Sequence, residues 1–282
     1  MIQYNKKTIA KVIFMRYVFD NDMHIHTFLS SCSRVPEENP AAILAYAQKY
    51  GLKTVCATDH FWDSEVEGAS GWYKPQDYAH ISQSLPLPQA EGIRFLFGCE
   101  TDMDKNCRIG LAPQNYDKFD FIIVPTTHLH MSGFTCRGDE DAAERAELWV
   151  KRFDALLDSD LPFRKVGVAH LTCPLIMRDK PDDPHDYCAD VLSRIPDREM
   201  ERLFARSAAC GLGIELNFSV SRITADNADI YLRPYRIARK HGCRFYFGSD
   251  AHKPSTLEAE KANAEAIIDL LGLEESDKFI LA

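Results

Sequence analysis

Histidines and carboxylates recur along this chain in short polar clusters, each directly after an apolar run. Six of the ten histidines occupy such a place, and one glutamate and one aspartate do the same. The set consists of His24, His26, His60, Glu100, His128, His170, Asp250 and His252. Imidazole and carboxylate are ordinary ligands of divalent transition metals. Eight such groups exceed the four ligands of one tetrahedral zinc ion, so the pattern predicts more than one metal ion.

The spacing of His24 and His26 suits metal binding in particular. In an extended segment, residues two apart point to the same face, so both imidazoles can reach one ion. One such pair is weak evidence, because a single histidine is more often an ordinary core or surface residue. The prediction rests on the whole combination, which also includes a Thr-Asp-His motif ending at His60 and an Asp-Ala-His motif ending at His252.

The apolar runs before these residues predict seven strands. They cover residues 17–19, 54–57, 94–97, 121–124, 165–169, 212–216 and 244–247. Predicted helices begin near residues 40, 141, 197, 234 and 255, the last with Ser255 and Glu258 in capping-box spacing. Alternating strands and helices predict a parallel α/β sheet. If the sheet closes into a barrel, the carboxyl ends of its strands converge on one face, where such barrels carry their active sites.

Composition excludes several classes of protein. The chain has 282 residues, of which 45% are hydrophobic, and a net charge of −9. That charge disfavours nucleic-acid binding, and no apolar run is long enough to span a membrane. Nine scattered cysteines are typical of reduced thiols in a cytoplasmic protein. We expect residues 1–19 to form an N-terminal extension leading into the first strand, with Met15 a candidate start, and residues 20–282 to form one domain.

In their order, these motifs resemble the PHP (polymerase and histidinol phosphatase) family over roughly residues 20–255. The resemblance implies a distorted (β/α)7 TIM-like barrel whose trinuclear metal centre hydrolyses phosphate esters. Chain length is more similar to the stand-alone phosphatases, such as histidinol-phosphatase, than to polymerase-embedded domains. By position, the resemblance assigns His24, His26, Glu100 and Asp250 to a first ion, Glu100, His128 and His170 to a second, and His60 and His252 to a third.

The chain departs from the family pattern at the third ion. Many three-metal members place a histidine six residues after the second histidine of the first motif, and here that residue is Cys32. A thiolate ligand there would favour a soft or borderline ion such as zinc. The alternative is an inert thiol beside a weak third site. We therefore expect two to three divalent ions, which could be zinc, iron or manganese.

Three further features could contact a substrate. Arg222 occupies the position of a family arginine that contacts the substrate phosphate, although a solvated loop arginine is the alternative. His130 follows His128 by two residues and could face either the pocket or solvent. The segment 61–75 contains Trp62 and Trp72 and follows a candidate ligand, so it could form a lid or pack on the barrel rim.

The sequence thus predicts a metal-dependent phosphomonoesterase, histidinol-phosphatase-like, that acts on a small phosphorylated metabolite. A hydroxide bridging two metal ions would attack phosphorus, and Asp250 or His252 would protonate the departing alcohol. Two other interpretations stay open: an amidohydrolase-like barrel that hydrolyses C–N bonds, and a non-catalytic metal-binding barrel. The oligomeric state is not predicted.

Overall fold

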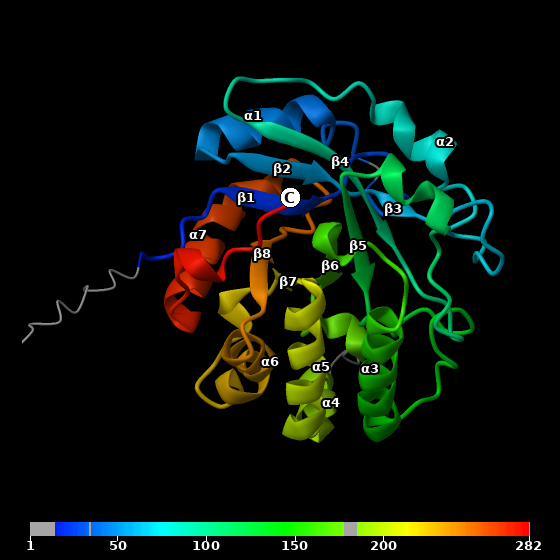
Figure 1. Cartoon of the computed structure of the whole chain (residues 1–282), viewed down its shortest axis with the longest axis vertical. Helices are drawn as coiled ribbons and strands as arrows, with labels where there is room; N and C mark the ends of the chain where they lie inside the picture. The colour runs from blue at the N-terminus through cyan, green and yellow to red at the C-terminus, as the bar shows by residue number, and fades with distance from the viewer. Residues whose placement is uncertain (1–14, 34, 178–184, 282) are drawn as a thin grey trace, which may run out of the picture.

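The computed structural model describes residues 15–33, 35–177 and 185–281. Eight parallel strands form one sheet in the order β1-β2-β4-β5-β6-β7-β8, with the short β3 paired to β4. The two ends of this order meet, because Ile25 forms a parallel bridge with Ala251 and the backbone N–H of His26 donates to the Ala251 carbonyl at 3.0 Å. The sheet is thereby nearly closed (Figure 1). The predicted TIM-like barrel is confirmed.

The strands are β1 Asn21–Ile25, β2 Thr54–Ala57, β3 His60–Phe61, β4 Arg94–Thr101, β5 Phe121–Pro125, β6 Val166–Ala169, β7 Gly213–Leu216 and β8 Arg244–Phe247. The first strand was predicted wrongly at residues 17–19, which belong to no strand. Tyr17 and Phe19 are apolar because they pack in the core, at 0% and 4% exposed. Strand β1 is instead the polar segment that carries His24, and its five residues are all buried.

The helices are α1 Pro40–Tyr50, α2 Tyr78–Ile81, α3 Ala142–Leu157, α4 Tyr187–Arg194, α5 Asp197–Cys210, α6 Ala228–Lys240 and α7 Pro254–Leu271. They lie outside the ring of strands (Figure 1). Helix α6 begins six residues before Pro234, which it contains, so its predicted start was wrong. Helix α7 begins at Pro254, one residue before the predicted start, but the predicted capping box of Ser255 and Glu258 does not form. None of the helices in the described ranges is both long and apolar enough to cross a membrane.

Side chains from most of the strands fill the inside of the barrel. The cluster consists of Met23, Cys56, Leu96, Phe121, Ile123, Ala169 and Tyr246. Packing is close, since a Cβ on Gly167 would lie 2.4 Å from the Tyr246 hydroxyl. A larger apolar cluster joins the strands to the outer helices. The carboxyl ends of the strands therefore rest on a packed core, which holds their side chains in fixed positions.

Part of the predicted N-terminal extension, residues 1–14, lies outside the described residues. The residues that follow it contact the C-terminal segment. The backbone N–H of Tyr17 donates to the Leu273 carbonyl at 3.0 Å, and the N–H of Glu275 donates to the Met15 carbonyl at 2.8 Å. The segment that leads into β1 is therefore tied to the chain's last turn.

Candidate metal centre

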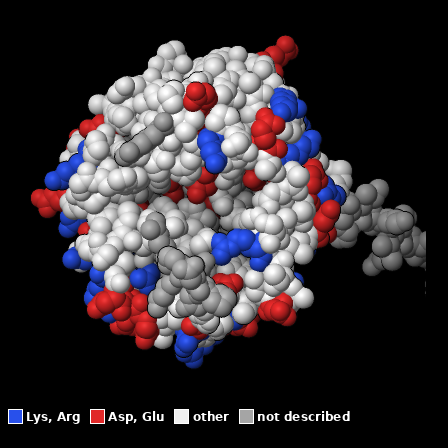
Figure 2. All heavy atoms as spheres, turned by 180° about the vertical axis from the view of Figure 1, so that it is seen from behind, with Lys and Arg blue, Asp and Glu red and all other residues white. Residues whose placement is uncertain are grey.

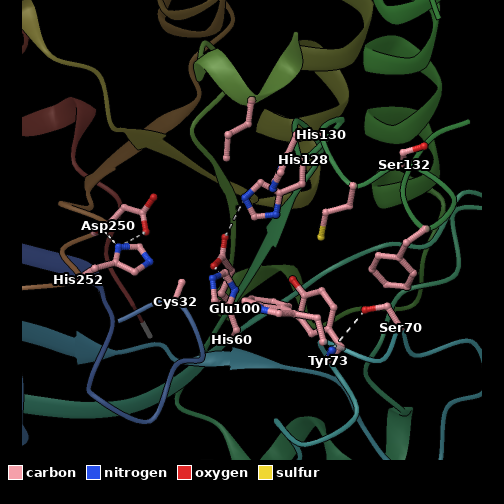
Figure 3. Close-up of a pocket in the computed structure, with 14 residues that line it drawn as sticks. Cys32, His60, Ser70, Tyr73, Glu100, His128, His130, Ser132, Asp250 and His252 are labelled. Carbon is pink, nitrogen blue, oxygen red and sulfur yellow. Dashed lines mark hydrogen bonds and ion pairs between the residues drawn. The ribbon is translucent and has the colours of Figure 1, made fainter. Parts of the chain in front are cut away.

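The predicted ligands meet at the carboxyl ends of the strands. His24 is the fourth residue of β1, His60 begins β3 and Glu100 is the seventh residue of β4. His26, His128, His170, Asp250 and His252 follow the ends of their strands. Several of these side chains line a cavity of about 510 Å³ (Figure 3). On the side opposite the view of Figure 1 the surface is hollowed, with acidic side chains inside the hollow (Figure 2).

Glu100 occupies the middle of the cluster and is 1% exposed. Its Oε2 atom lies 2.8 Å from Nδ1 of His60 and 3.4 Å from Nε2 of His26. Its Oε1 atom lies 3.2 Å from Nε2 of His170 and 3.8 Å from Nε2 of His128. One carboxylate thus faces imidazoles on both of its oxygens, which is the geometry expected of a carboxylate shared by two ions.

Three sets of donor atoms from the predicted ligands gather within 4.8 Å. They are His24, His26 and Glu100; Glu100, His128 and His170; and His26, Cys32, His60 and His252. Asp250 adds its Oδ1 atom 2.9 Å from Nε2 of His26. Cys32, whose role the sequence left open, is therefore within reach of three imidazoles. The structure brings all nine predicted ligands into one cluster.

Four of the imidazoles are held from behind through their Nδ1 atoms. The partners are the Glu215 carboxylate for His24 at 2.6 Å, the Ser30 hydroxyl for His26 at 2.8 Å, the Asp102 carboxylate for His128 at 2.9 Å and the Thr127 hydroxyl for His170 at 2.9 Å. In each ring the Nε2 atom then faces the cluster. Such outer partners fix the tautomer and orientation of metal-binding histidines, and a Nδ1–H donated to a carboxylate leaves Nε2 free for a cation.

Asp102 and Glu215 were missed in the sequence. Asp102 is fully buried and also accepts from the Arg152 guanidinium at 3.0 Å and from the Tyr73 hydroxyl at 3.2 Å. Glu215 is fully buried in β7 and accepts a second hydrogen bond at 2.6 Å from the backbone N–H of His170. For Glu215 the available signal was a lone acidic residue within an otherwise apolar strand, whereas Asp102, between Glu100 and Asp104, carried no such signal.

Burial and charge act in opposite directions on the central groups. Burial alone would lower the pKa of His24, but the charges of Glu215 and Asp250 outweigh it and raise that pKa well above its usual range. Burial would raise the pKa of Glu100, yet the imidazoles of His60 and His24 hold it well below its usual range. The cluster is thus strongly attractive to positive charge, and cation binding there is coupled to proton release.

The residues fit a centre of divalent cations. Oε2 of Glu100 and Nδ1 of His60 are buried and lie 2.8 Å apart, but they do not form a hydrogen bond with each other. Neither atom has a hydrogen-bond partner among the described residues. Buried polar atoms without a partner are costly, and a shared cation would satisfy both. Imidazoles, carboxylates and one thiol are the donor types that zinc, iron and manganese accept.

Comparison with known families agrees with this geometry. The family model of the PHP domain matches residues 22–203. The chain belongs to the PHP domain family. The predicted enzyme class, a metal-dependent phosphatase and hence a hydrolase, is confirmed. No curated protein matches the chain.

A solved structure shares the fold of this PHP domain. It is a histidinol phosphate phosphatase from Lactococcus lactis subsp. lactis Il1403, complexed with zinc, L-histidinol and phosphate. The TM-score is 0.60, the sequence identity is 16%, and the alignment covers 93% of this chain and 98% of that chain. At 16% identity the similarity shows a shared fold and does not show a shared substrate.

Two predicted ligands have backbone angles in a strained region. His170 has a φ of 32° and Asp250 a φ of 52°, in the left-handed region that non-glycine residues seldom adopt. The backbone at Gly248, two residues before Asp250, is also closely packed. A Cβ on Gly248 would lie 2.2 Å from Oε1 of Glu215 and 2.6 Å from Cβ of His24. Only glycine leaves room for the carboxylate that holds His24, and such strain is a recurrent feature of functional sites.

The remaining candidate residues are placed differently. His130 lines the cavity. Arg222 ends a short 3-10 turn after β7, is exposed, and is not among the residues that line the cavity. In the segment 61–75, Trp62 and Tyr73 are buried, at 1% and 0% exposed, whereas Trp72 remains 36% exposed and lines the cavity. Trp62 and Tyr73 therefore pack against the barrel, whereas eight of the fifteen residues of the segment are exposed, and Ser70, Trp72 and Tyr73 line the cavity.

Proposed function

We propose that this PHP domain is a phosphomonoesterase of a small phosphorylated metabolite, with histidinol phosphate as the first candidate. The proposal rests chiefly on one observation: a buried carboxylate, Glu100, is surrounded by imidazoles, four of which have their other nitrogen held by an outer partner. Prepared ligands of this kind bind cations without reorganising. The cavity of about 510 Å³ is of the size typical of small-molecule sites.

We assign the ions as the resemblance implies. A first ion would be held by His24, His26, Glu100 and Asp250, a second by Glu100, His128 and His170, and a third by His60, His252 and Cys32. Cys32 is assigned as a ligand because its sulfur lies within 4.8 Å of donor atoms from three histidines. Nitrogen donors with one sulfur form a set that zinc accepts readily.

When bound, the ions supply charge that stabilises the phosphate and activate the attacking water. The outer partners hold the ligand side chains in place, and burial keeps most of the cluster away from solvent. Burial alone would raise the pKa of Asp250, but the charges of His24 and His26 lower it. Burial and the charge of His26 lower the pKa of His252 to about 4. Both groups are thus deprotonated near neutral pH, as ligands must be.

The predicted proton transfer from Asp250 or His252 therefore stays a prediction. A deprotonated group donates no proton to the leaving alcohol unless it first receives one, for example from the attacking water. The pH dependence of kcat tests this assignment. With metal in excess, a general acid loses activity as pH rises above its pKa. A basic limb that disappears when His252 is replaced by Gln would therefore support proton transfer, while an unchanged basic limb would leave His252 a ligand only.

The proposed contact with the substrate phosphate, Arg222, lies outside the cavity lining. None of the cavity-lining residues within the described ranges is a lysine or arginine. Arg222 remains the proposed contact, and its exposed side chain would have to turn toward the cavity. Arg222→Ala should then lower kcat/KM by about 10–100-fold with unchanged metal content. Kinetics within twofold of the parent would remove Arg222 from the site.

Substrate class provides the direct test. Metal-loaded protein should hydrolyse p-nitrophenyl phosphate faster than bis(p-nitrophenyl) phosphate, and a chelator should abolish both activities. An amide and a lactone assayed under the same conditions should remain intact. Faster turnover of the amide or lactone would contradict a phosphatase, and faster turnover of the diester would contradict a monoesterase. Full metal content without turnover of any substrate would indicate the non-catalytic barrel.

A further inference from the structure

One part of the cavity lining, here called the wall, is aromatic and apolar and adjoins the candidate ligands. The wall consists of Trp72, Tyr73, Met131, Phe134 and Leu175. Figure 3 shows Tyr73 on one side of the cavity and Asp250 with His252 on the other. A phosphate held by the candidate ligands would therefore direct its ester group toward this wall.

Trp72 connects the wall to the cluster. Its ring lies 4.9 Å from the ring of His60, at an interplanar angle of 69°, and 4.8 Å from the ring of Tyr73, at 89°. Tyr73 in turn lies 5.5 Å from Phe134. Trp72 is 36% exposed, and it belongs to the few large apolar side chains of the described ranges with that much exposure. Its exposed surface is available to a ligand directly beside a predicted metal ligand.

The wall is held rigidly from behind. Tyr73 is fully buried, and its hydroxyl donates to Asp102 at 3.2 Å, the same carboxylate that holds His128. The Trp72 carbonyl accepts a hydrogen bond at 3.0 Å from the side chain of Gln76. A preorganised aromatic surface loses little conformational entropy when a ligand packs on it, which makes such a surface an efficient recognition element.

We propose that Trp72 determines substrate specificity by packing on a ring in the alcohol part of the substrate. This inference rests on the proposed phosphatase function and adds the residue that would recognise a ring in the alcohol part. Aromatic rings gain from stacked or edge-to-face contact, and a tryptophan face also attracts cations.

The test uses two alkyl monophosphates whose leaving alcohols have similar reactivity. Phenethyl phosphate carries a ring, and propyl phosphate does not, so their kcat/KM ratio isolates recognition of the ring. The parent protein should prefer phenethyl phosphate by about 10-fold, the size expected of one good aromatic contact with its buried area. In Trp72→Ala the preference should fall to within about twofold, because phenethyl phosphate loses more kcat/KM than propyl phosphate, and the metal content should be unchanged. Trp72→Phe should retain part of the preference.

Phe28→Ala is the matched control, since Phe28 is a 42% exposed aromatic residue outside the cavity lining. It should leave the ratio unchanged. Equal turnover of both esters by the parent would overturn the specificity inference and leave the phosphatase proposal standing. Loss of metal from Trp72→Ala with equal slowing of both esters would also overturn it, because Trp72 would then only support His60. If neither ester nor p-nitrophenyl phosphate is hydrolysed by metal-loaded protein, both proposals fail.

Discussion

Replacing Glu215 by Gln tests whether hydrogen bonds behind the ligands prepare the metal centre. Glu215 is fully buried and contacts no cavity. Its Oε1 atom lies 2.6 Å from Nδ1 of His24, and its Oε2 atom accepts from the backbone N–H of His170 at 2.6 Å. Both partners belong to the predicted ligands. The substitution keeps the shape of the side chain and removes one acceptor and one negative charge.

An amide can satisfy only one of these two partners as an acceptor. If its oxygen faces the N–H of His170, its NH2 group points at Nδ1 of His24, which must then accept a hydrogen bond. His24 would move its proton to Nε2, the nitrogen that faces the cluster, and would cease to be a ligand. If the amide is turned round, the backbone N–H of His170 faces NH2 instead. Either arrangement leaves one buried donor unsatisfied.

We therefore expect Glu215→Gln to weaken metal binding by about 10–100-fold, the usual effect of losing an outer partner. That factor corresponds to roughly 1.4–2.7 kcal/mol, which agrees with the loss of one hydrogen bond to a charged group. Competition with a chromophoric chelator would measure the affinity, and elemental analysis would measure the metal content. The fall in activity should be recovered in part by adding excess metal.

Glu260→Gln is the matched control, because Glu260 is also a buried glutamate, 7% exposed, and contacts no predicted ligand. It should leave metal affinity within twofold of the parent. If Glu215→Gln binds metal as tightly as the parent, the hydrogen bond to His24 does not prepare a ligand. If both variants lose metal equally, the effect is a general consequence of disturbing buried carboxyl groups.

Three further outcomes are expected. Cobalt-loaded protein should show a sulfur-to-cobalt charge-transfer band that Cys32→Ser abolishes, and a band that is absent from the parent would mean that Cys32 is no ligand. Glu100→Gln should lose at least one metal ion and lower kcat by at least ~10²-fold, so unchanged turnover would contradict a bridging role. Glu260→Gln should raise the thermal midpoint at pH 8. Burial raises the pKa of Glu260 well above its ordinary value of 4.5, so the folded parent retains a proton that the unfolded chain loses, and its stability falls as pH rises above that value. A difference in midpoint equal at pH 4 and pH 8 would refute this.

The clustering of the predicted ligands could be foreseen from the sequence because the strands of a parallel barrel end on one face. Every strand of such a barrel points the same way, so residues at successive strand ends meet whatever their separation. His24 and Glu100 are far apart in the chain, yet their side chains lie 3.6 Å apart. The error in β1 did not affect this result, since moving the strand by a few residues left His24 and His26 at its carboxyl end.

The outer partners could not be predicted in the same way. Glu215 reaches His24 across 191 positions and His170 across 45, and no local spacing marks such a contact. The role of Asp102 likewise depends on tertiary contacts, because its carboxylate accepts hydrogen bonds from Arg152 and Tyr73, which are distant in the sequence. A buried acid in a strand of apolar residues is costly unless it is paired. That cost is itself a signal, because a lone glutamate within a buried strand implies a partner even when the sequence does not say which.

Gly248 shows how local sequence and tertiary contact combine at this site. In the chain it looks like an ordinary turn glycine that precedes Ser249 and Asp250. In the structure it is required by close approach, because a Cβ there would overlap the Glu215 carboxylate and crowd His24. Asp250 meanwhile keeps a φ of 52°, which its backbone N–H supports by donating to the His24 carbonyl at 2.8 Å. Strand β1, which carries the predicted ligand His24, therefore also positions the predicted ligand Asp250. The first and last strands, β1 and β8, thus meet beside the candidate metal centre.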